Sequence, residues 1–180
     1  MLFSKKRSVT NTPMGSAPFV YDENGNVAWD KMWSTFCYLA REGGPPHRGD
    51  MLKTDPNLVN TKDPKFKKNI YEVMRAYKML LPYKIGYAVS TPEIIVHLPF
   101  TKMAKWFEET ILMENVFVRR EKNKIFVVVS EKYELEKEIK NLVTVFAKAF
   151  HYWDLHMNVL NKLSILLFGI DWQFRKPKEN

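Results

Sequence analysis

Cysteine is nearly absent from this 180-residue chain, in which Cys37 is the only one. A single thiol excludes a disulfide within the chain and a zinc site built from several cysteines. Cys37 also falls close to the apolar face of a predicted helix, where we expect it to pack as a small apolar group. The cysteine content therefore predicts a protein of a reducing compartment, the cytoplasm.

Long hydrophobic runs are also missing. The run from residue 163 to 170 is interrupted by Ser164 and is far shorter than the roughly 20 residues that a membrane-spanning helix needs. The first ten residues contain the basic cluster Lys5, Lys6 and Arg7 but no apolar core of a signal peptide. We expect neither a membrane span nor a secretion signal.

Motifs for catalysis and cofactor binding are lacking as well. There is no Gly-x-Ser-x-Gly motif, and the glycines match neither a Walker A loop nor a dinucleotide-binding fingerprint. Carboxylates are plentiful, but no spacing singles out a pair for acid–base catalysis. These absences favour a non-enzymatic protein but do not exclude an enzyme. They identify no cofactor.

What the chain has in excess is positive charge. Its 28 Lys and Arg against 20 Asp and Glu give a formal charge of +8 and a pI near 9.4. Such a balance favours anionic partners, although the same charge also serves solubility. Apolar residues make up 46% of the chain, enough for a folded core.

The residue patterns predict one helix-rich α+β domain over residues 19–170. Residues 1–18 lack periodicity and predict a flexible arm, and residues 171–180 predict a basic tail. Helical periodicity predicts helices over 28–41, 64–80 and 101–112, the second of them capped by Asp63 with Pro64 in its first turn. Apolar runs predict strands of a small antiparallel sheet near 84–90, 116–118 and 125–129, with a charged turn over 119–124.

The most regular feature is an apolar seam between Tyr133 and Phe168. Its members recur at alternating steps of four and three residues, the pattern of a helix that buries one face against a partner. One helix of this length would extend over roughly 50 Å, more than a single small core needs. We expect a long C-terminal helix that spans the molecule or, preferably, pairs with a second copy in a homodimer. The seam contains Leu135, Ile139, Leu142, Phe146, Ala149, Trp153, His156, Leu160, Leu163 and Leu167.

Residues 66–130 match the element order of a winged helix-turn-helix if Glu93 to Leu98 is helical. The helix from Thr101 would then read the nucleic acid, and the charged turn would be the wing. The run Ile94-Ile95-Val96 favours a strand instead, which would make this region a small α+β sheet and remove most of the case. The predicted nucleic-acid contacts are Lys102, Lys105, Arg119, Arg120, Lys122 and Lys124.

A second candidate site combines the loop Gly43–Gly49 with the end of the seam. Glycines leave backbone amides accessible, prolines stiffen the loop, and two of its side chains are donors for an anion. An anionic aromatic ligand or a cofactor would suit such a pocket. The predicted ligand-binding residues are Gly44, His47, Arg48, Tyr152, Trp153 and His156.

The two late histidines do not predict a metal site. His151 and His156 are five residues apart, which is about 140° around a straight α-helix, so they should diverge. His156 is more simply a hydrogen-bonded polar group that fixes the register of the helix.

We therefore expect a non-enzymatic binding or regulatory protein directed at an anionic partner, with nucleic acid as the leading candidate. The alternative is a small-molecule or cofactor-binding protein, which could include an enzyme, with its site between the Gly43–Gly49 loop and the late histidines.

Overall fold

The computed structural model describes residues 19–32, 50–88 and 90–169. The predicted N-terminal arm, most of the first predicted helix, the Gly43–Gly49 loop and the basic tail lie outside these residues. Residues 29–32 are the described part of that first helix. Its Trp29 is buried, and the indole N–H donates to Oε1 of Glu72 at 2.7 Å.

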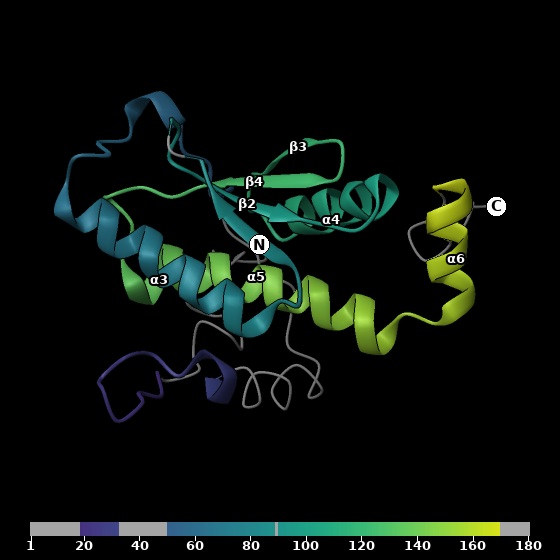
Figure 1. Ribbon diagram of the computed structural model, residues 1–180, viewed down its shortest axis with the longest axis horizontal. Coiled ribbons are helices and arrows are strands. Elements are labelled where there is room, and N and C mark those ends of the chain that lie inside the picture. The colour runs from purple at the N-terminus through teal and green to yellow at the C-terminus, as the bar shows by residue number, and fades with distance from the viewer. Residues whose placement is uncertain (1–18, 33–49, 89, 170–180) are drawn as a thin grey trace, which may run out of the picture.

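The described chain forms a helix-rich α+β domain, which confirms the predicted fold class (Figure 1). Within these residues, no helix has the length and apolar character needed to cross a membrane. A 3-10 turn, η2 (Pro56–Leu58), precedes the main elements, and π-helical segments η3 (Leu135–Ile139) and η4 (Tyr152–His156) flank α5. The main elements are α3 (Pro64–Leu80), β1 (Lys84–Tyr87), β2 (Glu93–His97), α4 (Thr101–Met113), β3 (Arg119–Glu121), β4 (Lys124–Val128), α5 (Lys140–His151) and α6 (Val159–Phe168).

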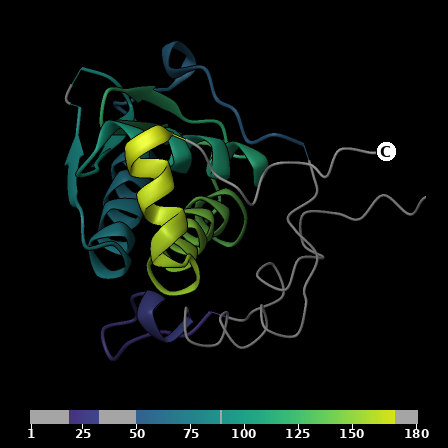
Figure 2. The same ribbon diagram turned by 90° about the vertical axis from the view of Figure 1, so that its right-hand side faces the viewer.

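The strands form one antiparallel sheet of order β1-β2-β4-β3. Figures 1 and 2 show α3 and α5 on the same side of this sheet, so we call that side the inner face and the opposite side the outer face. Successive side chains of a strand point to opposite faces. On β2 and β4 the inner-face side chains are all buried, namely Ile94, Val96, Ile125 and Val127.

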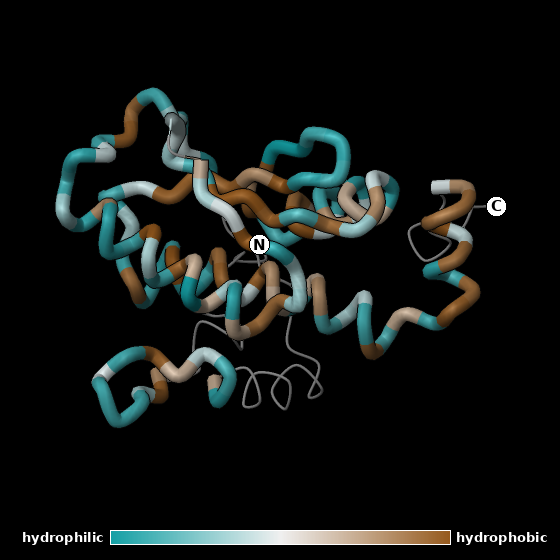
Figure 3. Tube along the Cα trace, in the orientation of Figure 1, coloured by the Kyte–Doolittle hydropathy of each residue, from teal (hydrophilic) through white to brown (hydrophobic). Residues whose placement is uncertain are grey.

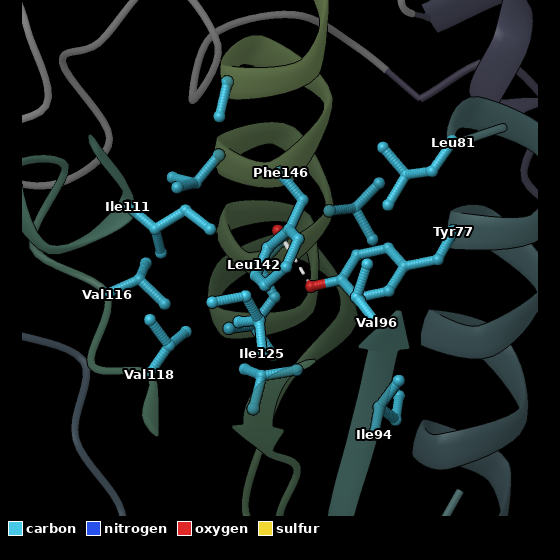
Figure 4. Packing of buried hydrophobic residues seen from close by; sticks show 14 of the residues in the cluster. Tyr77, Leu81, Ile94, Val96, Ile111, Val116, Val118, Ile125, Leu142 and Phe146 are labelled. Carbon is cyan, nitrogen blue, oxygen red and sulfur yellow. Dashed lines mark hydrogen bonds between the residues drawn. The ribbon is translucent and has the colours of Figure 1, made fainter. Parts of the chain in front are cut away.

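The core lies between this inner face and the helices (Figure 4). Tyr77 of α3 packs against Phe146 of α5 with ring centroids 4.6 Å apart, and its hydroxyl donates to the carbonyl of Leu142 at 3.3 Å. Burial raises the pKa of the Tyr77 phenol well above its ordinary value. Each large ring buried here contributes roughly 2–3 kcal/mol, so this cluster is a main source of stability.

The predicted start of α3 is confirmed. The Asp63 carboxylate accepts from the backbone N–H of Lys65 at 2.7 Å, and Pro64 occupies the first turn. Such a cap satisfies an N–H that has no partner within the helix, and a first-turn proline loses no hydrogen bond.

The segment that decided the winged-helix interpretation is a strand. β2 lies between β1 and β4, and it pairs with β4 over its whole length and with β1 from Ile94 to His97. Its β-branched run suits a central strand, where both edges of the backbone are hydrogen-bonded. The helix pair of a helix-turn-helix is therefore not formed, and the region is the small α+β sheet that the alternative described.

The predicted charged turn is shorter than expected. Arg119–Glu121 is itself strand β3, and Glu121 pairs with Lys124 across a two-residue turn in which Lys122 has a φ of 52°. The preceding Val116, predicted as a strand residue, instead forms an isolated bridge with Leu52. Val116 and Val118 are buried in the core, and pairing with β4 begins only at Arg119.

The long C-terminal helix is present, but the prediction that it runs unbroken to Phe168 is wrong. It is continuous through η3, α5 and η4, after which Met157 is extended and Asn158 caps α6 by accepting from the N–H of Asn161 at 2.7 Å. The break divides the predicted seam. Its first part is largely buried, whereas Leu160, Leu163 and Leu167 are 79%, 46% and 61% exposed.

Candidate functional site

A row of basic side chains crosses the outer face of the sheet. Lys84 of β1 pairs with His97 of β2, and His97 pairs with Lys124 of β4. Because neighbouring strands are about 4.8 Å apart, the backbones of the three residues lie within about 10 Å. Partial burial, followed by the charges of Lys124 and Lys84, lowers the pKa of His97. The row therefore concentrates positive charge and hydrogen-bond donors in a small area.

Arg119 of the edge strand β3 lies across the outer face, held flat on an aromatic ring of β4. The guanidinium carbon of Arg119 lies 4.0 Å from the ring centroid of Phe126. Glu93, whose carboxylate is almost buried, accepts from Nη2 of Arg119 at 3.0 and 3.2 Å and from Nε at 3.3 Å. Thr91 holds the same carboxylate with a 2.9 Å hydrogen bond.

This arrangement fixes a planar cation that still reaches solvent. The Arg119 side chain is 42% exposed, whereas the Phe126 residue beneath it is 8% exposed. Hydrogen bonds to a carboxylate and contact with an aromatic face each stabilise a guanidinium in one orientation. The side of Arg119 that faces away from Phe126 is thus a preformed surface on which a flat group can stack.

The outer face is basic but not uniformly so. Glu121 forms an ion pair with Arg119 and lies opposite Lys124, and Glu93 also offsets part of the Arg119 charge. The lysines that add charge are Lys84 on the opposite edge strand β1, Lys124 on β4, and Lys122 in the turn between β3 and β4. In Figure 3 the hydrophilic colour follows β3 and that turn.

The structure brings together only part of the predicted nucleic-acid contacts. Arg119 and Lys124 lie on the outer face, and Lys122 lies at its border. Arg120 points to the inner side, where it binds Glu108 of α4 at 2.7 Å. Lys102 and Lys105 lie on α4, where Lys102 donates to the carbonyl of Leu167 and Lys105 lies 3.8 Å from Glu109.

Sequence reasoning missed three residues of the outer face: Lys84, His97 and Phe126. If Glu93 to His97 is a strand, its side chains alternate between the two faces of the sheet. His97 then lies on the same face as Glu93, and Val96 lies on the other face. Cross-strand pairing, which the sequence alone does not specify, was needed to bring the three residues to one surface.

The predicted ligand pocket is only partly described. Gly44, His47 and Arg48 lie outside the described residues. Trp153 packs in the core against Trp106 and Phe107, with centroid distances of 5.1 and 6.1 Å. The remaining two predicted residues do meet, because the Tyr152 ring is stacked on His156 at 6.3 Å.

The late histidines are side by side, contrary to the prediction that they diverge. Nε2 of His151 and Nε2 of His156 are 3.2 Å apart. The prediction assumed a straight α-helix, but η4 is a π-helical turn in which the N–H of Met157 donates to the carbonyl of Tyr152, five residues earlier. A π-turn inserts one extra residue, so positions five apart come to one side of the helix.

No group of three or more His, Cys, Asp or Glu residues suited to hold a metal occurs among the described residues. Comparisons with family models, with curated proteins and with solved structures found no match to this chain. Function is therefore inferred from the chemistry of the chain itself.

Proposed function

We propose that this is a cytoplasmic, non-enzymatic binding protein for single-stranded nucleic acid, which it holds across the outer face of the sheet. The observation that carries the proposal is Arg119, a planar cation fixed on Phe126 by Glu93 and open to solvent on its other side. Bases of single strands stack on aromatic rings and on arginine planes, while lysines bind the phosphates. Lys84 and Lys124, which flank His97 on the neighbouring strands, would bind the phosphates.

A single strand fits this surface better than a duplex. Reading a duplex requires an element that enters the major groove, usually a helix. In this structure α4 packs on the inner side of the sheet, and its Glu108 binds Arg120 there. A splayed single strand needs only a flat face with a stacking group and nearby cations, as many sheet-based RNA-binding modules use.

The test is fluorescence anisotropy of a labelled single-stranded oligonucleotide at several salt concentrations. Removing two phosphate contacts with Lys84→Ala plus Lys124→Ala should weaken binding and make the slope of log K against log salt less negative by about 1.4. Lys67→Ala plus Lys68→Ala removes the same charge from exposed positions of α3 and is the matched control. Equal effects of the two double variants would show that only net charge matters and would refute the proposed surface.

A charge-conserving variant separates stacking from simple attraction. Arg119→Lys keeps the positive charge but loses the plane and the two-point contact with Glu93. We expect it to weaken binding by about 1–3 kcal/mol, the usual contribution of one stacked base. Unchanged affinity in Arg119→Lys would show that Arg119 is not a stacking platform.

A second candidate function is the formation of a homodimer through α6. The buried side of α6 includes the polar Asn161 and Ser164, whereas Leu160, Leu163 and Leu167 are exposed on the other side. Ile165 on the buried side anchors α6 to the core, but the leucine stripe on the other side is more than an amphipathic helix usually leaves in water. A second copy would offer the same leucines, so the two stripes would bury each other.

Sedimentation velocity tests the homodimer directly. The wild type should be a dimer at micromolar concentration, and Leu160→Lys plus Leu167→Lys should be a monomer with an unchanged melting temperature, because both side chains are exposed. A wild type that remains a monomer at the highest soluble concentration would contradict this proposal and leave the nucleic-acid proposal untouched.

A further inference from the structure

We propose that His151 and His156 form a two-imidazole binding site for a divalent transition metal, with zinc or nickel as the chemical class. The site lies on η4, away from the outer face, so it does not depend on the proposed nucleic-acid function. It reverses the expectation from the sequence, because the π-turn brings together two side chains that a straight helix would separate.

The distance between the two nitrogens is the first argument. Nε2 of His151 and Nε2 of His156 are 3.2 Å apart. Two nitrogens on one tetrahedral zinc, with bonds of about 2.0–2.1 Å, lie about 3.3 Å from each other. The two rings therefore already have the separation of adjacent metal ligands.

The orientation of the rings is the second argument. It is the Nε2 atoms, which side-chain imidazoles commonly use for metals, that converge. In the metal-free protein one ring donates its Nε2 proton to the other. A tautomer change that moves this proton to Nδ1 leaves two lone pairs directed at the space between the rings.

The neighbourhood also holds one ring in place while keeping it accessible. The Tyr152 ring stacks on His156. It also stacks on Trp106, with an interplanar angle of 12°. His156 is exposed and His151 is half-buried, so an ion can reach the pair and water can complete its coordination. Imidazole is a good ligand for both zinc and nickel.

The experiment titrates the full chain, without a histidine tag, separately with zinc chloride and nickel chloride in a calorimeter. We expect one ion per chain, and a loss of affinity of at least ~10-fold in His151→Gln and in His156→Gln. His97→Gln is the matched control, because His97 lies on β2 in the same protein and should leave binding unchanged. Circular dichroism without metal checks that each variant folds, and the exposed His156 makes its variant the safer of the two.

A spectroscopic readout supports the assignment. Nickel quenches tryptophan fluorescence at short range, and Trp153 lies within the same π-turn as His156. Quenching should appear in the wild type and in His97→Gln but not in the folded His156→Gln variant. Full affinity in His156→Gln, dependence on His97, or no binding by the wild type at millimolar metal would each overturn the proposal.

Discussion

The two faces of the sheet use the same strands for different purposes. The inner face presents Ile94, Val96, Ile125 and Val127, which the helices bury completely. The outer face presents Lys84, His97 and Lys124 in one row and an arginine held by a buried carboxylate. The inner face is apolar because the burial of apolar side chains stabilises the fold. Folding makes no comparable demand for the basic row, which is why we propose the row as the binding surface.

The largest expected effect of a substitution lies on the inner face. Ile125→Ala should lower the free energy of unfolding by about 2–5 kcal/mol, because Ile125 is fully buried and the change leaves a cavity. Ile95→Ala, on the outer face of the neighbouring strand, should cost about half of that or less. Urea denaturation measures both. Equal losses would mean that the outer face is also part of the core.

An intermediate effect is expected at Glu93, whose nearly buried carboxylate holds the exposed Arg119 in place. Glu93→Gln should lower stability by about 1–2 kcal/mol, because a nearly buried carboxylate loses its charged hydrogen bonds to Arg119. It should also weaken oligonucleotide binding, since Arg119 is then free to leave Phe126. Glu121→Gln, which removes only an exposed ion pair, should leave stability almost unchanged. Normal binding by Glu93→Gln would show that the fixed orientation of Arg119 is not needed.

A smaller effect concerns the protonation of His97. In the free protein its pKa is lowered by partial burial and by Lys124 and Lys84. A bound polyanion favours the imidazolium, so the pKa should rise in the complex and binding should strengthen as pH falls from the pKa of the complex to that of the free protein. Glu121 of the neighbouring strand β3 pairs with Lys124 in both the free and the bound protein, so it does not alter this comparison. NMR titration of the His97 imidazole protons, with and without oligonucleotide, measures the change.

The smallest effect is expected when substitutions in the basic row are tested for their effect on the stability of the protein. Lys84→Ala plus Lys124→Ala should change the free energy of unfolding by less than about 0.5 kcal/mol, because both side chains are exposed. Thermal unfolding beside the binding assay checks this. A large loss of stability would mean that the row serves the fold, and the contrast between the two faces would disappear.

Local chemistry made much of the fold predictable from the sequence. The cap at Asp63, the limits of α3 and the presence of α4 follow from patterns within a few residues. The limits of β3 did not, because a charged sequence reads as a turn until its neighbour β4 is known to pair with it. The break at Met157 was also not predicted. The leucines continue the seam beyond it, but the backbone leaves the helical conformation there.

The candidate site was less predictable than the fold for the same reason. Arg119 and Lys124 stood out as charges, but their surface exists only through strand pairing with β2. The meeting of His151 and His156 depends on one additional residue in a helical turn, which periodicity cannot reveal.

The most direct test of the outer face is a ¹H–¹⁵N NMR titration of the wild type with a single-stranded oligonucleotide. We predict chemical-shift changes on the strands, at Lys84, His97, Arg119 and Lys124 and their neighbours, with α3 and α4 little affected. Changes confined to α4 and the Lys122 turn, or no changes at all under conditions of saturation, would contradict it.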